Sequence, residues 1–152
     1  MLSKTTVLLV EDNDDDIQLT RRAFKKHHIA NELHVMTDGQ QAVDFLFAAG
    51  QYAQRDPEDL PHVVLLDLKL PRLDGLEVLR RIRENPRTRY LPVVVLTSSN
   101  EERDLVESYR LGANSYVRKP VDFEQFALAA QQLGLYWMVL NIAAQNRSNT
   151  DV

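Results

Sequence analysis

Three carboxylates stand where apolar runs of the sequence end. Residues 7–10 (Val-Leu-Leu-Val) lead directly into Glu11 and Asp12, and residues 63–66 (Val-Val-Leu-Leu) lead into Asp67. Uninterrupted Val and Leu runs of this length are typical of strands buried on both faces of a parallel sheet. Ligands bind at the carboxyl ends of such strands, so we expect these three acids to lie close together.

The polar groups nearby suit phosphoryl chemistry. A run at 93–96 ends in the hydroxyl of Thr97, and Lys119 follows a weaker run at 114–117. Three ionised carboxylates repel one another unless a cation lies among them. All-oxygen ligands that leave coordination positions open suit Mg²⁺, which also accepts phosphate oxygens. A carboxylate can act as a nucleophile toward phosphorus, while the metal and an ammonium neutralise the transferred oxygens.

The elements that must position these groups alternate along the chain. Strands are predicted near 7–10, 33–36, 63–66, 93–96 and 114–117, and helices at about 14–28, 38–50, 76–84, 101–111 and from 122. Right-handed crossovers then give an α/β fold, a five-stranded parallel sheet with five helices on both faces in the flavodoxin-like arrangement. The loop at 51–61 exceeds the usual ~2–6 residues of such connections, so we expect it to be a contact element.

The composition excludes several classes of function. The chain has 152 residues and a formal net charge of −4, which gives no reason to expect nucleic acid or a membrane surface as partner. It has no cysteine, which excludes disulfides, thiolate metal sites and cysteine nucleophiles. We expect no signal peptide before the first strand, and no apolar stretch approaches the ~18 residues that span a bilayer. We therefore expect a cytoplasmic protein.

Five short motifs follow one another at the predicted strand ends: Glu11-Asp12, Asp67, Pro71 with Gly75, Thr97, and Lys119-Pro120. Their order resembles the receiver domain of two-component response regulators, from residue 5 to about 132. The resemblance implies that Asp67 accepts a phosphoryl group from a sensor histidine kinase. Such a protein is a signalling switch or phosphorelay intermediate that catalyses only its own phosphorylation and dephosphorylation.

The same resemblance implies a metal site. Glu11 and Asp12 would hold Mg²⁺ together with Asp67, Asp12 directly and Glu11 through water. The main-chain carbonyl of Lys69 would be a further ligand. The side chain at that position varies in the family and bears on the rate of dephosphorylation.

A switch is implied as well. Lys119 would contact the phosphoryl group, and the Thr97 hydroxyl would move onto it. Tyr116 falls where the family places an aromatic side chain that rotates inward when this hydroxyl moves. That coupling would carry the signal to the surface formed by the fourth helix, the fifth strand and the last helix.

The end of the chain has a second apolar surface. Residues 133–142 extend the last helix and are apolar nearly all round, so one face needs a further partner. We expect a receiver domain at 1–132, and at 133–152 a helix extension with a disordered tail. This apolar extension, together with the long loop at 51–61, resembles the stand-alone regulators that accompany bacterial phytochromes. The resemblance implies that the kinase is a phytochrome and that the protein is a homodimer. The expected dimer contacts are Tyr136, Trp137, Met138 and Leu140.

Other interpretations fit less well. Asp14–Asp16 are expected to cap a helix and complement its dipole, because a calcium loop beginning at Asp12 would need glycine where Ile17 stands. A haloacid-dehalogenase-type phosphatase would need a second aspartate two residues after Asp67, where this chain has Lys69. A scaffold that is never phosphorylated would not need the complete acidic set.

Overall fold

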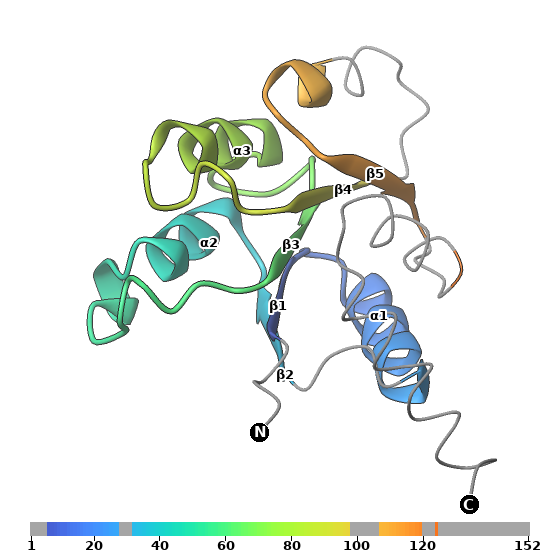
Figure 1. Cartoon of the computed structure of the whole chain (residues 1–152). Coiled ribbons are helices and arrows are strands. Elements are labelled where there is room, and N and C mark those ends of the chain that lie inside the picture. Colours follow the sequence, from blue (N-terminus) through green and yellow to red (C-terminus); the bar gives the residue numbers. More distant parts are fainter. Residues whose placement is uncertain (1–5, 28–31, 98–106, 120–123, 125–152) are drawn as a thin grey trace, which may run out of the picture.

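The computed structural model describes residues 6–27, 32–97, 107–119 and 124. Its centre is a five-stranded sheet in the order β2-β1-β3-β4-β5. Every neighbouring pair is parallel, so the predicted sheet is confirmed (Figure 1). The strands are β1 (Thr6–Val10), β2 (Glu32–Met36), β3 (Val63–Asp67), β4 (Val93–Thr97) and β5 (Ser115–Arg118).

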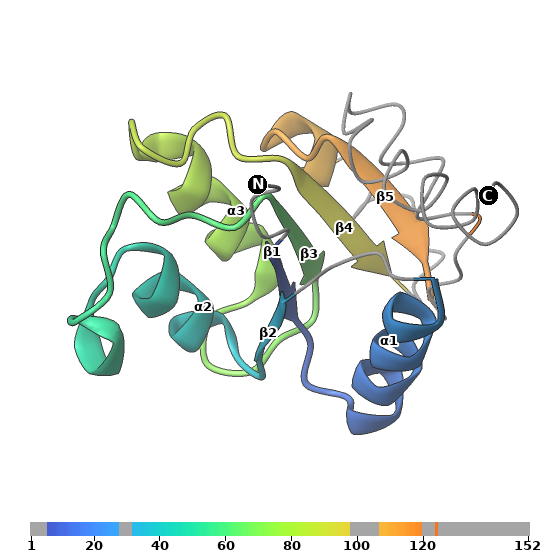
Figure 2. The same ribbon diagram turned by 60° about the horizontal axis from the view of Figure 1, so that its bottom comes forward.

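Helices cover both faces of this sheet. The helix α1 (Asp14–His27) lies on one face, and α2 (Gly39–Leu46) and α3 (Gly75–Glu84) lie together on the other (Figures 1 and 2). Residues 107–110 are helical and belong to the predicted fourth helix. The predicted last helix lies outside the described residues except for Glu124, which is helical. No helix in the described ranges is long and apolar enough to cross a lipid bilayer.

The strands divide their side chains between two apolar layers. Leu8 and Val64 belong to one buried cluster with residues of α2 and α3. Leu9 and Leu65 are fully buried too, and the two-residue period of a strand turns them to the opposite face, where Phe24 of α1 is buried. Burial on both faces explains why the strands are continuous apolar runs instead of alternating ones.

The second helix ends earlier than predicted. The sequence pattern placed its end at Gly50, but α2 stops at Leu46. Ala48 adopts a left-handed backbone conformation with φ of 53°, and the Ala49 N–H donates to the Asp44 carbonyl at 2.8 Å. This turn provides a hydrogen-bond donor for one of the last carbonyls of the helix, as a turn with glycine at the left-handed position commonly does. The stop was missed because alanine rarely occupies such a position.

The loop at 51–61 folds back onto its own domain. It begins within a short 3-10 helix, η1 (Gly50–Tyr52), whose Tyr52 hydroxyl lies 3.2 Å from the Met36 sulfur. The Arg55 guanidinium lies 3.7 Å from the centroid of the Phe45 ring and donates to the Phe45 carbonyl. These contacts account for the order of the loop, and its role as a contact element for another molecule stays a prediction.

Candidate functional site

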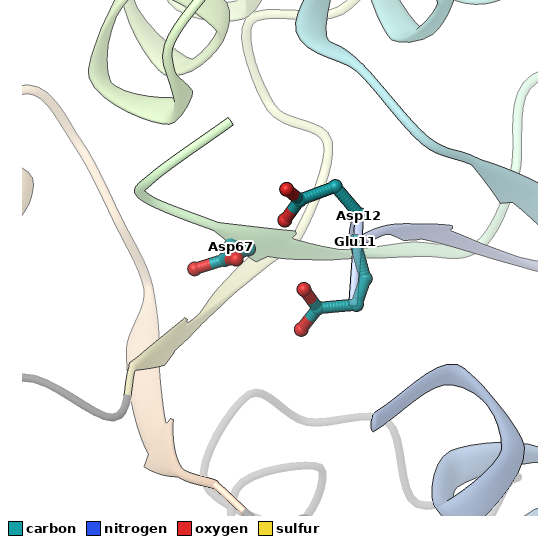
Figure 3. A group of neighbouring side chains, drawn as sticks. All are labelled: Glu11, Asp12 and Asp67. Carbon is teal, nitrogen blue, oxygen red and sulfur yellow. The ribbon is translucent and has the colours of Figure 1, made fainter. Parts of the chain in front are cut away.

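The three carboxylates meet at the carboxyl ends of β1 and β3. Val10 and Leu66 are paired in register, so Glu11 and Asp12 emerge beside Asp67, the last residue of β3. Figure 3 shows the three side chains grouped at this edge. One oxygen of each carboxylate lies within 4.8 Å of the others. Glu11 is 1% and Asp67 7% exposed, whereas Asp12 is exposed, so the group opens to solvent at Asp12.

An ammonium lies against this acidic group. Lys119 directly follows β5, and its side chain is 9% exposed. Its Nζ lies 2.6 Å from Glu11 Oε1 and 3.3 Å from Asp67 Oδ2. The sequence predicted Glu11, Asp12, Asp67 and Lys119 at one site, and the structure brings these four residues together.

Burial and charge act in opposite directions on Glu11. Removal from water raises the pKa of this carboxyl, the hydrogen bond from Lys119 lowers it, and repulsion from Asp67 raises it again. The result is a pKa of about 7. In the absence of a metal, Glu11 therefore shares a proton with solvent near neutral pH, and a divalent cation would compete with that proton.

The same contacts hold Lys119 in its charged form. Burial lowers the pKa of this ammonium, but the hydrogen bond to Glu11 and the charges of Asp67 and Glu11 outweigh burial. The pKa is therefore raised above its ordinary value. A permanently charged donor beside Asp67 suits an anionic group placed there.

The turn after β3 requires glycine at its end. Asp74 caps α3 by accepting from the Glu77 N–H at 2.9 Å, and the Gly75 N–H donates to the Leu68 carbonyl at 2.8 Å. A Cβ on Gly75 would lie 2.2 Å from the Asp67 carbonyl oxygen, a distance at which side chains do not fit. The start of α3 therefore lies directly against the backbone of Asp67, while the Lys69 N–H donates to Asp67 Oδ1 at 3.3 Å.

The predicted switch residues lie on the neighbouring strands. Thr97 is the last residue of β4, paired in register with Arg118, but its side chain lies outside the described part of the structure. Tyr116 on β5 is 39% exposed and packs edge-to-face on Tyr109, with ring centroids 6.0 Å apart. Its ring is therefore at the surface in this state.

One residue at the site was assigned another role by the sequence. Asp16 was expected to serve the helix start, yet its Oδ2 lies 3.1 Å from Lys119 Nζ. A signal was present in the spacing, since Asp16, Thr20 and Ala23 recur at helical intervals and so share one face of α1. Thr20 is buried and donates to the Asp16 carbonyl at 2.9 Å, which marks this face as the inner one.

The arrangement agrees with the comparison to known proteins. The sequence profile described as the response regulator receiver domain matches residues 7–131. The chain belongs to the response regulator receiver family. Members of this family are signalling proteins that interact with histidine kinases and bind a divalent metal, and the acidic group described above fits such an ion.

Relatives of this receiver include response regulators whose names connect them with phytochromes. The bacteriophytochrome response regulator AtBRR is 52% identical, and the match covers 88% of this chain and 94% of that one with a TM-score of 0.79. Response regulator Rcp1 of Synechocystis sp. is 39% identical over 132 residues, which is 87% of this chain and 88% of Rcp1. The predicted resemblance to phytochrome-associated regulators is therefore confirmed.

Two solved structures bear on the chemistry of the site. A Mn²⁺-bound form of Rcp1 is 38% identical, covering 88% of this chain and 94% of that one with a TM-score of 0.71. The phosphorylated cyanobacterial phytochrome response regulator RcpA is 35% identical, covering 88% of this chain and 91% of that one, also with a TM-score of 0.71. Relatives of this receiver thus hold a divalent metal and a phosphoryl group.

Proposed function

We propose that Asp67 is the phosphoacceptor of this receiver and takes its phosphoryl group from a sensor histidine kinase. The observation that carries the proposal is the grouping of Asp67 with Glu11, Asp12 and Lys119 at one strand edge. In the transfer, an Asp67 oxygen forms a bond to the phosphorus of the kinase's phosphohistidine, while the bond from that phosphorus to the imidazole nitrogen breaks. The imidazole leaves with that electron pair, and Asp67 becomes an acyl phosphate.

The metal in this proposal is Mg²⁺. Glu11, Asp12 and Asp67 supply carboxylate oxygens, and the main-chain carbonyl of Lys69 is the proposed further ligand. An all-oxygen donor set with an exposed member at Asp12 leaves room for water and phosphate oxygens, which Mg²⁺ prefers. When bound, the ion offsets the negative charge of the acids and of the transferred group. Lys119 holds a positive charge beside Asp67, with its Nζ 3.3 Å from Asp67 Oδ2.

The protein acts on no separate substrate in this proposal. Its own Asp67 is both nucleophile and product, and water later cleaves the acyl phosphate to restore the carboxylate. Two positions after Asp67 the chain has Lys69, where a haloacid-dehalogenase-type phosphatase would need an acid. Hydrolysis of p-nitrophenyl phosphate with multiple turnovers would contradict this part of the proposal.

The test of the phosphoacceptor is the variant Asp67→Asn with radiolabelled acetyl phosphate and Mg²⁺. We expect the intact protein to take up label, Asp67→Asn to take up none, and chelation of the metal to abolish labelling. Asp59→Asn is the matched control, because this substitution makes the same change of charge and Asp59 is exposed in the loop at 51–61. Retention of label by Asp67→Asn would disprove the assignment.

The signal is proposed to pass through Thr97 and Tyr116. Phosphorylation would shift a two-state equilibrium in which the Thr97 hydroxyl moves onto the phosphoryl group and the Tyr116 ring leaves the surface. The exposed position of Tyr116 beside Tyr109 supports assigning this structure to the unphosphorylated state. Chemical iodination of Tyr116 should then decrease after treatment with acetyl phosphate, and unchanged iodination would contradict the coupling.

The kinase is proposed to be a phytochrome. The support is the likeness to AtBRR and RcpA, whose names connect those proteins with phytochromes. Phosphotransfer profiling against a panel of histidine kinases tests this proposal, with fastest transfer expected from a phytochrome kinase. The absence of cysteine is compatible with a cytoplasmic location, which stays a prediction.

Two predictions concern residues outside the described ranges. One is the set of dimer contacts, Tyr136, Trp137, Met138 and Leu140. The other is the boundary between a receiver at 1–132 and an extension at 133–152. Both stay predictions from the sequence.

A further inference from the structure

Asp16 is a fourth carboxylate at the site, and the proposed function gives it no role. It lies in the first turn of α1, and its side chain is 26% exposed and 3.1 Å from Lys119 Nζ. Asp14 and Asp15 belong to the same turn but are exposed. Within the described residues, neither of them contacts Lys119. Of the three acids at this helix start, Asp16 is thus the one directed to the site.

Asp16 belongs to a closed ring of contacts. The Asn13 N–H donates to Glu11 Oε2 at 3.2 Å, and the Asp16 N–H donates to Asn13 Oδ1 at 3.0 Å. Lys119 Nζ completes the ring by donating to Asp16 Oδ2 and to Glu11 Oε1. Asn13, and not one of the three expected aspartates, thus caps α1, and this cap places the Asp16 carboxylate at a defined position relative to the end of β1.

The three partners of Lys119 differ in what the proposed function requires of them. An ammonium has three donors, and here they reach Glu11, Asp16 and Asp67. Glu11 and Asp67 belong to the group that can hold a metal, whereas Asp16 does not. Asp16 is therefore the partner that stays available to Lys119 when the other two bind a metal or carry a phosphoryl group. A flexible lysine side chain loses much of its freedom when its ammonium has such a fixed partner.

We propose that Asp16 is a positioning residue, whose contact with Lys119 keeps the ammonium within reach of the phosphoryl group transferred to Asp67. This inference rests on the proposed function of Asp67 and Lys119. Loss of the Asp16 charge frees Lys119 to adopt other rotamers, so fewer molecules hold the ammonium in the productive place. We expect Asp16→Asn to lower the maximal rate of acyl-phosphate formation about three- to tenfold.

The experiment compares initial rates of labelling by acetyl phosphate in the full chain, over a range of acetyl phosphate and Mg²⁺ concentrations. Asp15→Asn is the matched control, because it removes the same charge from the same helical turn without touching Lys119. We expect Asp16→Asn to have a lower maximal rate than Asp15→Asn, with the half-saturating Mg²⁺ concentration of the two variants within about twofold. Asp16→Glu, which keeps the carboxylate, should recover most of the rate.

A background without the ammonium separates positioning from a general structural effect. In Lys119→Met, adding Asp16→Asn should have no further effect on labelling, because Asp16 then has no ammonium to place. Circular dichroism establishes that each variant is folded, and Asp16→Ser, which a helix start tolerates, replaces Asp16→Asn if that variant is not. Equal slowing by Asp16→Asn in both backgrounds would overturn the proposal.

The outcomes also separate this inference from the proposed function. If the intact chain takes up no label, or if Asp67→Asn still does, the proposed function itself is wrong. If the intact chain is labelled at Asp67 while Asp16→Asn and Asp15→Asn react at the same rate, only the role of Asp16 is wrong. The same holds if Asp16→Glu is as slow as Asp16→Asn.

Discussion

Among single residues, Glu11 is the most strongly perturbed acid of the site. It is nearly inaccessible to water, yet it lies beside the acid Asp67 and the ammonium of Lys119. A carboxyl buried in this way favours its protonated form unless a cation is near. A divalent metal bound among these acids would therefore compete with a proton on Glu11.

The pKa of Glu11 makes stability depend on pH. Its pKa rises from 4.5 in the unfolded chain to about 7 in the folded one. Between these values the folded state binds the proton more tightly, so the free energy of unfolding falls as pH rises through the window. For the metal-free protein we expect Glu11 to contribute a decrease on the order of 1–3 kcal/mol.

Urea denaturation in the presence of a chelator, at several pH values from 4.5 to 8, measures this dependence. Glu11→Gln is the control, because it keeps the size of the side chain and cannot titrate. The wild-type free energy of unfolding minus that of Glu11→Gln should decrease as pH rises to about 7 and level off above it. A difference that is flat across the window would contradict the raised pKa.

Among the elements, α3 is tied to the rest of the domain at both ends. Its start lies against the Asp67 backbone, and its last turn carries the half-buried Arg83. The Arg83 guanidinium donates to the carbonyls of Gly112 at 2.9 Å and Leu91 at 2.7 Å, and to Asn114 Oδ1 at 2.8 Å. One side chain thus joins α3 to the segments that precede β4 and β5.

We expect Arg83→Lys to lower the free energy of unfolding by roughly 1–3 kcal/mol, because an ammonium cannot reproduce the spread donors of the guanidinium. Arg80→Lys is the matched control on the same helix. Arg80 is paired with Glu77 and Glu84 at the surface, where ion pairs contribute little, so Arg80→Lys should lower the free energy of unfolding much less than Arg83→Lys does. Urea denaturation measures both variants, and equal effects would contradict the role assigned to Arg83.

For the whole molecule, the sheet order sets the distance between Asp67, the proposed phosphoacceptor, and the proposed signalling surface around Tyr116. Asp67 ends β3, the middle strand, and β4 separates it from Tyr116 on β5. In the proposed switch, a change at Asp67 would therefore reach that surface by crossing one strand, whose last residue is Thr97. The exposed Tyr116 and Tyr109 rings are the described part of this proposed surface.

A change of oligomeric state is expected when the end of the chain is removed. The apolar segment at 133–142 predicts a dimer, because a helix that is apolar all round needs a second surface to cover it. Truncation after Gln132 should give a monomer, whereas the intact chain should sediment as a dimer at micromolar concentration. The double substitution Tyr136→Ala and Leu140→Ala is a milder variant that should weaken the dimer. A monomeric intact chain, with and without phosphorylation, would contradict the prediction.

The sequence by itself determined the sheet, the positions of α1, α2 and α3 apart from the end of α2, and the main acids of the site. Continuous apolar runs are typical of a parallel sheet covered on both sides, and parallel strands bring their carboxyl ends to one edge. Glu11, Asp12 and Asp67 therefore had to meet. Asn85-Pro86 likewise predicted the end of α3, which its structure confirms.

Only the tertiary structure decided which further side chains reach that edge. The contact of Asp16 with Lys119 joins residues 103 positions apart, and it depends on how α1 is rotated and placed against the sheet. A helical pattern predicts the face on which a residue lies, but not the distance from that face to another element. The same holds for Arg83 and for the folded-back loop, whose partners become neighbours only when the helices pack.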